Sequence, residues 1–267
     1  MLAELFLYAT TPCPPFVFRM GYLNEAIAIR SRYRRCAAAW AGHLEESKDA
    51  VRRTMQKCRT RRKAMVFGSG MLLDFPLHEM AEAFDELLLV DLVHLRSVRR
   101  AARRWKNIRL ITADITGVAE RLFQNSKQGI PELPTPTPLL PETDNNTDLV
   151  VSLNLLSQLP VIPAQYAQSK MRIDPERLSA WKDQIMQSHY QALTGLPCPV
   201  CLISDYELER RARDGAVLDR SSTINDMHLP RPDKKWLWEI APLGECSRKF
   251  SFWRRVAAVH LNTRRSI

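Results

Sequence analysis

The sequence lacks an uncharged apolar run of the roughly 18 residues that a membrane-spanning helix requires. Its apolar start, residues 2–8, contains Glu4 and has no basic residues before it, so it does not follow the pattern of a signal peptide. These two absences predict a cytoplasmic protein. Charged residues make up 25% and hydrophobic residues 45% of the chain. That balance is ordinary for a globular protein and excludes collagen-like, coiled-coil and wholly disordered chains.

The sequence also lacks clustered metal ligands and a regular cysteine framework. Its six cysteines are scattered, and disulfide frameworks are typical of exported chains, which this one does not resemble. Cys198 and Cys201 are separated by two residues, as in zinc and redox motifs, but no second cysteine or histidine pair lies near them in the sequence. We therefore expect buried structural thiols and no metal site.

Positive charge is concentrated near the N-terminus. The chain has 39 Lys and Arg against 29 Asp and Glu, a net charge of +10, and residues 1–63 alone hold 13 of the former and 5 of the latter. This excess fits either a solvated helical surface or contact with an anionic partner, nucleic acid or a membrane. Apolar residues in the segment recur at helical spacing, which predicts an amphipathic helix. They include Trp40, Leu44, Val51 and Met55.

From residue 64 onward, short apolar runs alternate with helical patterns. The runs expected to form strands are residues 64–67, 87–90, 108–112, 148–153 and 200–204. Such alternation predicts a doubly wound α/β fold, a mostly parallel sheet with helices on both faces. Residues 236–240 and 255–261 predict a terminal antiparallel pair of strands. The expected organisation is a basic N-terminal helical segment, residues 1–63, followed by an α/β domain, residues 64–267.

Residues 126–147 interrupt this alternation. Five prolines in the segment exclude a helix or an inner strand. They are Pro131, Pro134, Pro136, Pro138 and Pro141. A loop of this length is unusual in a compact domain and is often functional or disordered. We predict a mobile surface loop here.

Glycine, acidic or amide residues directly follow each of the first four expected strands. They are Gly68, Ser69 and Gly70 after the first strand, Asp91 after the second, Asp114 after the third and Asn154 after the fourth. Glycine allows a tight turn and a close approach of backbone to ligand. Ligands of such sheets bind outside the carboxyl ends of the strands, so these residues are expected to share one site. Taken singly, Asp91 and Asp114 also fit helix caps.

This set resembles the class I S-adenosylmethionine-dependent methyltransferases over roughly residues 64–261. The resemblance rests on Val66-Phe67-Gly68-Ser69-Gly70, on Val90-Asp91, on Ala113-Asp114-Ile115, on Ser152-Leu153-Asn154-Leu155-Leu156 and on the final strand pair. It implies a Rossmann-like methyltransferase fold with S-adenosyl-L-methionine (SAM) as cofactor. The glycine loop would flank the methionine part of SAM, Asp91 would hold the ribose, and Asp114 with Ile115 would hold the adenine. The segment starting at Asn154 would line the methyl group and part of the acceptor pocket.

The sequence departs from the family pattern at three places. The third glycine of the loop falls at Leu72, and Val66 stands where many members have an acid. The fourth strand leads into Ser157-Gln158-Leu159-Pro160 instead of the Asn/Asp-Pro-Pro-aromatic signature of enzymes that methylate exocyclic amines of bases. These departures keep open a methyltransferase-like fold without chemistry, serving as a binding or scaffold module.

A nicotinamide-dependent oxidoreductase of the Rossmann type is a further alternative, because it too uses a glycine loop and a later acid on the ribose. Its third glycine would fall at Leu73. The acid after the third strand and the terminal antiparallel pair favour the methyltransferase. The expected activity is therefore SAM-dependent methyl transfer to an acceptor that the sequence does not identify.

A small-molecule acceptor is preferred over nucleic acid. The arginines between Arg96 and Arg104 belong to an outer helix, and no aromatic residues alternate with them as a base-stacking surface would require. Nucleic acid remains an alternative through the basic N-terminal segment. The resemblance further implies that residues 21–58 shape the acceptor pocket more than the cofactor site.

No catalytic base is identified from the sequence. Asp205, Tyr206 and Glu207 follow the fifth expected strand and so belong to the edge of the sheet where ligands bind, although a loop with solvated charges is the preferred interpretation. His228 lies in a segment that could cover the pocket, but a surface histidine is the simpler interpretation.

Overall fold

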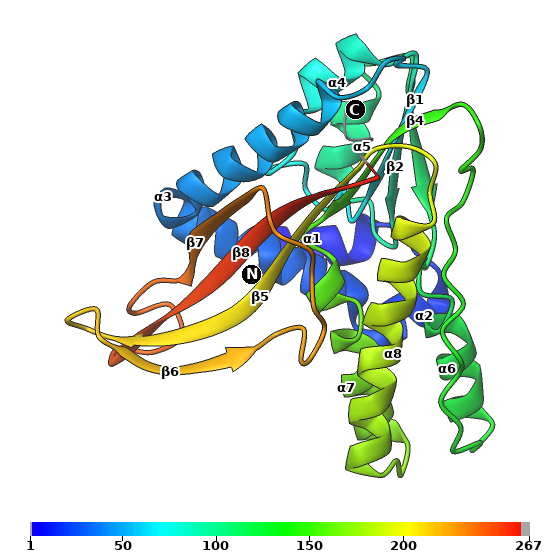
Figure 1. Cartoon of the computed structure of the whole chain (residues 1–267). Coiled ribbons are helices and arrows are strands. Elements are labelled where there is room, and N and C mark those ends of the chain that lie inside the picture. The colour runs from blue at the N-terminus through cyan, green and yellow to red at the C-terminus, as the bar shows by residue number, and fades with distance from the viewer. Residues whose placement is uncertain (1, 263–267) are drawn as a thin grey trace.

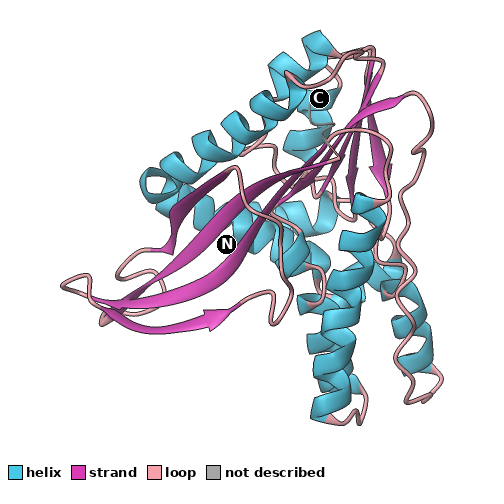
Figure 2. Cartoon of the chain, in the orientation of Figure 1, coloured by secondary structure: helices cyan, strands magenta, loops and turns pink. Residues whose placement is uncertain are grey.

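The computed structural model describes residues 2–262 and is built around one eight-stranded sheet (Figures 1 and 2). The strands are β1 (Lys63–Phe67), β2 (Glu86–Asp91), β3 (Ile108–Thr112), β4 (Thr147–Leu153), β5 (Val200–Ala212), β6 (Val217–Ser222), β7 (Lys234–Ala241) and β8 (Phe250–Leu261). Their order is β3-β2-β1-β4-β5-β8-β7, with β6 paired to β5 outside this path.

The first five strands run parallel, and β8 is antiparallel to both of its neighbours, β5 and β7. The predicted doubly wound, mostly parallel sheet with a terminal antiparallel pair is confirmed. The chain builds outward from β1 to β3 and then returns to the other side of β1 with β4. The strand order therefore reverses between β1 and β4, which is where sheets of this type bind their ligands.

Strands β1, β2 and β4 and the first part of β5 are buried on both faces, which explains their apolar runs. All five residues of β1 and all seven of β4 are buried. Successive side chains of β1 point to opposite faces of the sheet, so Met65 and Phe67 join one core and Ala64 and Val66 join the other. The two cores fix the register of β1 against its neighbours, because a slip of one residue would exchange the faces.

Helices cover both faces of the sheet. They are α1 (Leu2–Thr10), α2 (Pro15–Met20), α3 (Tyr22–Met55), α4 (Leu77–Ala83), α5 (Arg96–Ala102), α6 (Ala119–Lys127), α7 (Val161–Lys170) and α8 (Pro175–Thr194), with a short 3-10 helix η1 (Leu156–Gln158). Residues of α6, α7 and α8 contribute to one core, and residues of α4 and the C-terminal half of α3 contribute to the other. None of the described helices has the length and apolar character needed to cross a bilayer.

The long helix α3 is the predicted amphipathic helix, and it lies against β7 (Figure 1). Trp40 is 4% exposed, packs edge-on against Trp238 with ring centroids 5.1 Å apart, and donates from Nε1 to the carbonyl oxygen of Ile240 at 3.1 Å. Leu23 and Ile27, near the N-terminal end of α3, belong to the core that contains Met65 and Phe67. The helix therefore passes from one face of the sheet to the other.

The proline-rich segment packs on the body of the protein as an irregular loop between α6 and β4. Trp181 donates from Nε1 to the carbonyl oxygen of Pro134 at 2.7 Å, and Thr137 N donates to the carbonyl oxygen of Thr116 at 3.0 Å. Gly117 has a φ of +68°, and a Cβ there would lie 2.4 Å from the Thr137 carbonyl oxygen. The loop thus runs beside the segment that follows β3. Its mobility stays a prediction.

The antiparallel end of the sheet differs from the expectation. Strand β5 continues to Ala212 and pairs with β6 and β8, forming a ribbon that projects beyond the helices (Figure 1). The expected end of this strand at Ser204, with Asp205 and Glu207 in a loop, is wrong. Charged residues are compatible with this strand because they pair with one another. The buried carboxylate of Glu209, for example, lies 2.5 Å from Nη2 of Arg211 and 2.5 Å from Nε of Arg255.

Candidate cofactor and acceptor site

A cavity of about 460 Å³ lies at the carboxyl edge of the parallel strands. Of the seven residues singled out in the sequence, six line it: Gly68, Gly70, Asp91, Asp114, Ile115 and Asn154. The seventh, Ser69, is 1% exposed beneath the loop and does not line the cavity. The residues that follow four successive strands therefore meet at one cavity, although they are up to 86 positions apart in the chain.

The loop after β1 keeps the backbone shape of a glycine-rich turn. Gly68 and Gly70 have φ values of +75° and +49°, and a Cβ on Gly68 would lie 3.1 Å from the Leu153 carbonyl oxygen. Leu72, at the position of the family's third glycine, also has a positive φ of +61°. A left-handed backbone costs a residue with a Cβ about 1–2 kcal/mol. The loop therefore holds a leucine in a conformation that favours glycine.

Asp91 joins the ends of β1 and β2. Its Oδ2 accepts from Gly70 N at 2.8 Å and its Oδ1 accepts from Val93 N at 3.2 Å. A carboxylate has about four lone pairs. Two protein bonds therefore leave Asp91 able to accept two more from a ligand in the cavity.

Asp114 organises the turn into α6. This agrees with the helix-cap role that its position in the sequence also allowed. Its Oδ1 accepts from Thr116 N at 2.9 Å and Thr116 Oγ1 at 2.6 Å, and its Oδ2 accepts from Ala119 N at 2.7 Å. It nevertheless lines the cavity, beside Tyr22 of α3. Burial, together with the charge of Asp114, raises the pKa of the Tyr22 hydroxyl well above its ordinary value. Tyr22 is therefore a neutral donor at this end of the cavity.

Asn154 lies in a polar cluster that the sequence did not reveal. Its backbone is left-handed, with a φ of +50°, and its Nδ2 donates to Asp74 Oδ2 at 2.7 Å. The same Nδ2 lies 3.4 Å from Nε2 of His43. Its Oδ1 is buried and has no hydrogen-bond partner among the described residues. Asp74 and His43 are 80 and 111 positions from Asn154, so no local spacing signals the contact.

His43 is fixed between α3 and β7. Its ring stacks on Trp238 with centroids 3.9 Å apart and planes at 5°, and its Nδ1 accepts from Trp236 Nε1 at 3.0 Å. Burial, helped by the charge of Arg254, lowers the pKa of His43 to about 3. The ring is therefore neutral at physiological pH. His43 is thus a packed histidine that lies directly behind the cavity wall.

Arg254 of β8 lines the cavity as part of a second buried chain of polar groups. Its Nη1 donates to Asp205 Oδ2 at 2.5 Å, and Ser157 Oγ donates to Asp205 Oδ1 at 2.5 Å. Asp205 is 2% exposed, and the Nε of Arg254 is buried with no partner among the described residues. Asp205 is therefore the structural counter-ion of an arginine rather than a base that faces the cavity.

The remaining base candidates also lie away from the cavity. Tyr206 faces Lys235, whose Nζ lies 5.2 Å from its ring centroid, and Glu207 pairs with Arg255 at 2.9 Å. His228 is exposed. None of these three described residues lines the cavity. Helices α3, η1 and α7 also contribute to the cavity wall, with lining residues that include Ala26, Ile29, Gln158, Val161, Ile162 and Gln165.

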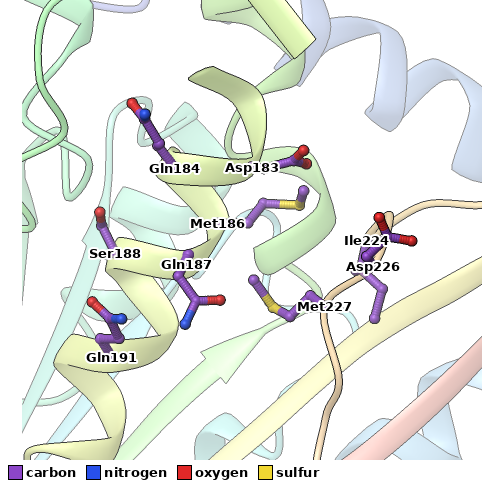
Figure 3. A pocket seen from close by; sticks show the side chains of 9 residues that line it. All are labelled: Asp183, Gln184, Met186, Gln187, Ser188, Gln191, Ile224, Asp226 and Met227. Atoms are coloured by element: carbon purple, nitrogen blue, oxygen red, sulfur yellow. The ribbon is translucent and has the colours of Figure 1, made fainter. Parts of the chain in front are cut away.

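A second cavity, of about 490 Å³, lies between α8 and the segment after β6 (Figure 3). It is lined by Asp183, Gln184, Met186, Gln187, Ser188, Gln191, Ile224, Asp226 and Met227. It contains none of the residues singled out from the sequence. Within residues 2–262, no group of three or more His, Cys, Asp or Glu side chains is placed to hold a metal ion. The cavity at the strand ends is therefore the candidate site.

Three of the solved structures that are similar to the chain contain bound S-adenosylhomocysteine. N-methyltransferase NodS from Bradyrhizobium japonicum WM9, in complex with S-adenosyl-L-homocysteine (SAH), is 11% identical, with 80% of this chain and 85% of that chain covered and a TM-score of 0.37. The DhpI–SAH complex is 12% identical, with 86% and 93% covered and a TM-score of 0.36. Burkholderia thailandensis 1,6-didemethyltoxoflavin-N1-methyltransferase, with 1,6-didemethyltoxoflavin and SAH bound, is 12% identical, with 88% and 89% covered and a TM-score of 0.34.

No family model and no curated protein sequence matches the chain. Because all three TM-scores lie below 0.5, the likeness adds nothing to the fold assignment. That assignment stands on the chain's own sheet. The order β3-β2-β1-β4-β5-β8-β7, with β8 alone reversed along it, is that of the Rossmann-like methyltransferase fold.

Proposed function

We propose that the protein binds SAM in the cavity at the strand ends and transfers its methyl group to a small-molecule acceptor. One observation carries the proposal. Asp91 after β2 and Asp114 after β3 line a single cavity together with Gly68 and Gly70 after β1. A glycine turn and two acids in this order match the three parts of SAM that a protein must recognise, namely its methionine part, its ribose and its adenine.

The cavity fits such a ligand in polarity. The two lone pairs that Asp91 retains suit the two hydroxyls of a ribose, and Ile115 offers an apolar surface for an adenine ring. At the other end, a buried carboxamide oxygen of Asn154 and a buried Nε of Arg254 have no partners among the described residues. Buried polar atoms are normally satisfied, so unpartnered ones beside a cavity point to a polar ligand there.

When bound, SAM would supply an electrophilic methyl group on a sulfonium. The chain's own residues would then place the acceptor in line with that group, which is the main contribution a protein makes to such a displacement. Leu155, Val161 and Ile162 would give the acceptor side an apolar wall. Glu25 of α3 is the third carboxylate of the described lining, and it would receive a proton from an acceptor that carries one.

A small acceptor fits the structure better than nucleic acid. Several of the N-terminal cations are already paired inside the molecule: Arg35 with Glu245, Arg52 with Glu79, Arg62 with Asp148 and Lys63 with Asp144. Paired cations offer less net charge to a phosphate backbone. We propose that residues 1–63 and 64–267 are the two parts of the chain and that residues 21–58 of the first act as a wall of the acceptor pocket.

Calorimetric titration with SAH tests the proposal. Asp91→Ala should weaken SAH binding by about 1.5–3 kcal/mol, the range for hydrogen bonds to a charged partner. Asp183→Ala, in the second cavity, is the matched control and should bind SAH like the native protein. Equal affinity of the Asp91 variant and the native protein would remove Asp91 from the site. Binding of NADH in place of SAH would favour an oxidoreductase, and binding of neither would favour a scaffold.

A further inference from the structure

Arg254 is the basic side chain of the described cavity lining, whose acids are Glu25, Asp91 and Asp114. The two aspartates follow β2 and β3, on one side of the point where the strand order reverses. Arg254 lies in β8, which comes after β4 and β5 on the other side. The order of the strands thus separates Arg254 from these two aspartates. An anionic group of a ligand is favoured beside Arg254 and disfavoured beside the aspartates.

Hydrogen bonds fix Arg254 to the segment that follows β4. Its Nη1 donates to Asp205 Oδ2 at 2.5 Å, and Ser157 Oγ of η1 donates to Asp205 Oδ1 at 2.5 Å. Gln158, the next residue of η1, donates from Nε2 to Ser157 Oγ at 3.2 Å and itself lines the cavity. The guanidinium is therefore held beside η1, on the side of the cavity that the proposed function gives to the methyl acceptor.

The pairing with Asp205 leaves N–H donors of Arg254 free for a ligand. A guanidinium has five N–H groups in a planar fork, and the hydrogen bonds of Arg254 to described residues use Nη1. The Nε is buried without a partner among the described residues, and the side chain as a whole is 19% exposed. Buried polar atoms are normally satisfied, so Arg254 is suited to bind a further oxygen-bearing group.

We propose that the methyl acceptor is a small carboxylic acid and that its carboxylate binds to Arg254. This inference rests on the proposed function and names the class of its acceptor. The fork of a guanidinium matches the two oxygens of a carboxylate. A single cation that already shares its charge with Asp205 suits a monoanion better than a phosphate dianion, because charges taken out of water need compensation.

The test follows the Nε–H signal of Arg254 by nuclear magnetic resonance, in the full chain with isotope-labelled arginine and saturating SAH. Arg254→Lys keeps a cation beside the buried Asp205, so that it should fold, and identifies the signal by its loss. Acetate is the probe, because it is a carboxylate small enough to enter any part of the cavity. Acetamide is the uncharged control of similar shape, and sodium chloride controls for ionic strength. Arg255, whose Nε lies 2.5 Å from Glu209 and which does not line the cavity, is the internal control.

We expect acetate to shift the Arg254 signal with half-saturation between about 5 and 100 mM, the range for one hydrogen-bonded contact between charged groups. Acetamide and chloride should leave the Arg254 signal in place, and acetate should leave the Arg255 signal in place. Inorganic phosphate should bind more weakly than acetate.

An Arg254 signal that acetate does not move, in protein that binds SAH, overturns the inference and leaves the proposed function standing. An equal shift with acetamide or chloride also overturns it, as does tighter binding of phosphate than of acetate. A shift that acetate causes only without SAH overturns it too, because Arg254 would then belong to the cofactor's part of the cavity. Failure of the native protein to bind SAH in calorimetry removes the proposed function and the inference together.

Discussion

The parallel and antiparallel halves of the sheet are built on different principles. Strands β1 and β4 are buried on both faces, and eight of their twelve residues are apolar. The ribbon of β5, β6 and β8 is half open to water, and all six residues of β6 are exposed. The first half is held by packing on two faces, whereas the second relies on pairing between strands and between charges. The candidate cavity lies at the end of the first half, and Arg254 of the second half is among its described lining residues.

Replacing a large side chain in each half should show the greatest contrast. Phe67 at the end of β1 is fully buried, and Phe67→Ala should cost about 3–5 kcal/mol of unfolding free energy because it leaves a cavity. Leu218 of β6 is 52% exposed, and Leu218→Ala should change stability by less than about 0.5 kcal/mol. Urea denaturation measures both. Similar costs for the two variants would mean that the ribbon packs on something in solution.

The same contrast explains how far the sequence predicts the fold. Burial on both faces gives β1, β2 and β4 continuous apolar runs, which are recognised without an alignment. Helix α8 begins at Pro175, and Asp174 caps it by accepting from Glu176 N and Arg177 N. Strand β6 was not predicted because none of its residues is buried, so its sequence shows no alternation of apolar and polar residues.

The residues of the candidate site also divide into those that the sequence predicts and those that it does not. Residues that follow strands could be predicted because parallel strands bring their carboxyl ends to one edge. Asp74 and His43 could not, because they meet Asn154 only after the β1 loop and helix α3 have folded against the sheet. Arg254 was missed for another reason. It lies within a strand, among other arginines, and only the course of β8 across the edge brings it to the cavity.

A pH experiment compares how tightly the two halves exclude water. His189 lies against the parallel half, with Nε2 at 3.0 Å from Ser152 Oγ, and burial lowers its pKa to about 4. His43 lies against β7 of the antiparallel half, with a pKa of about 3. In the unfolded chain both would titrate near their ordinary value of 6.5. The unfolded state therefore binds more protons between about pH 6.5 and 4, and stability falls as pH is lowered through this window.

Each histidine should contribute a slope of about 1.4 kcal/mol per pH unit near pH 5. His189→Gln and His43→Gln should each flatten the dependence of unfolding free energy on pH by that amount, measured by urea denaturation at pH 5 and 6. If only one of the two substitutions, His189→Gln or His43→Gln, flattens the slope, water reaches the other histidine in the folded protein.

The smallest effect concerns the backbone at the site itself. Leu72 is half-buried and has a φ of +61°, so alanine at this position would lose packing and keep the strain. Glycine would lose the same packing but would release about 1–2 kcal/mol of backbone strain. Its greater conformational freedom in the unfolded chain would cost about 0.5–1 kcal/mol of stability. Leu72→Gly should therefore be more stable than Leu72→Ala by up to about 1 kcal/mol, the reverse of the usual order. Thermal melting of the two variants measures the difference. A more stable alanine variant would show that the loop after β1 relaxes to a negative φ, and the cavity wall would then differ from the one described.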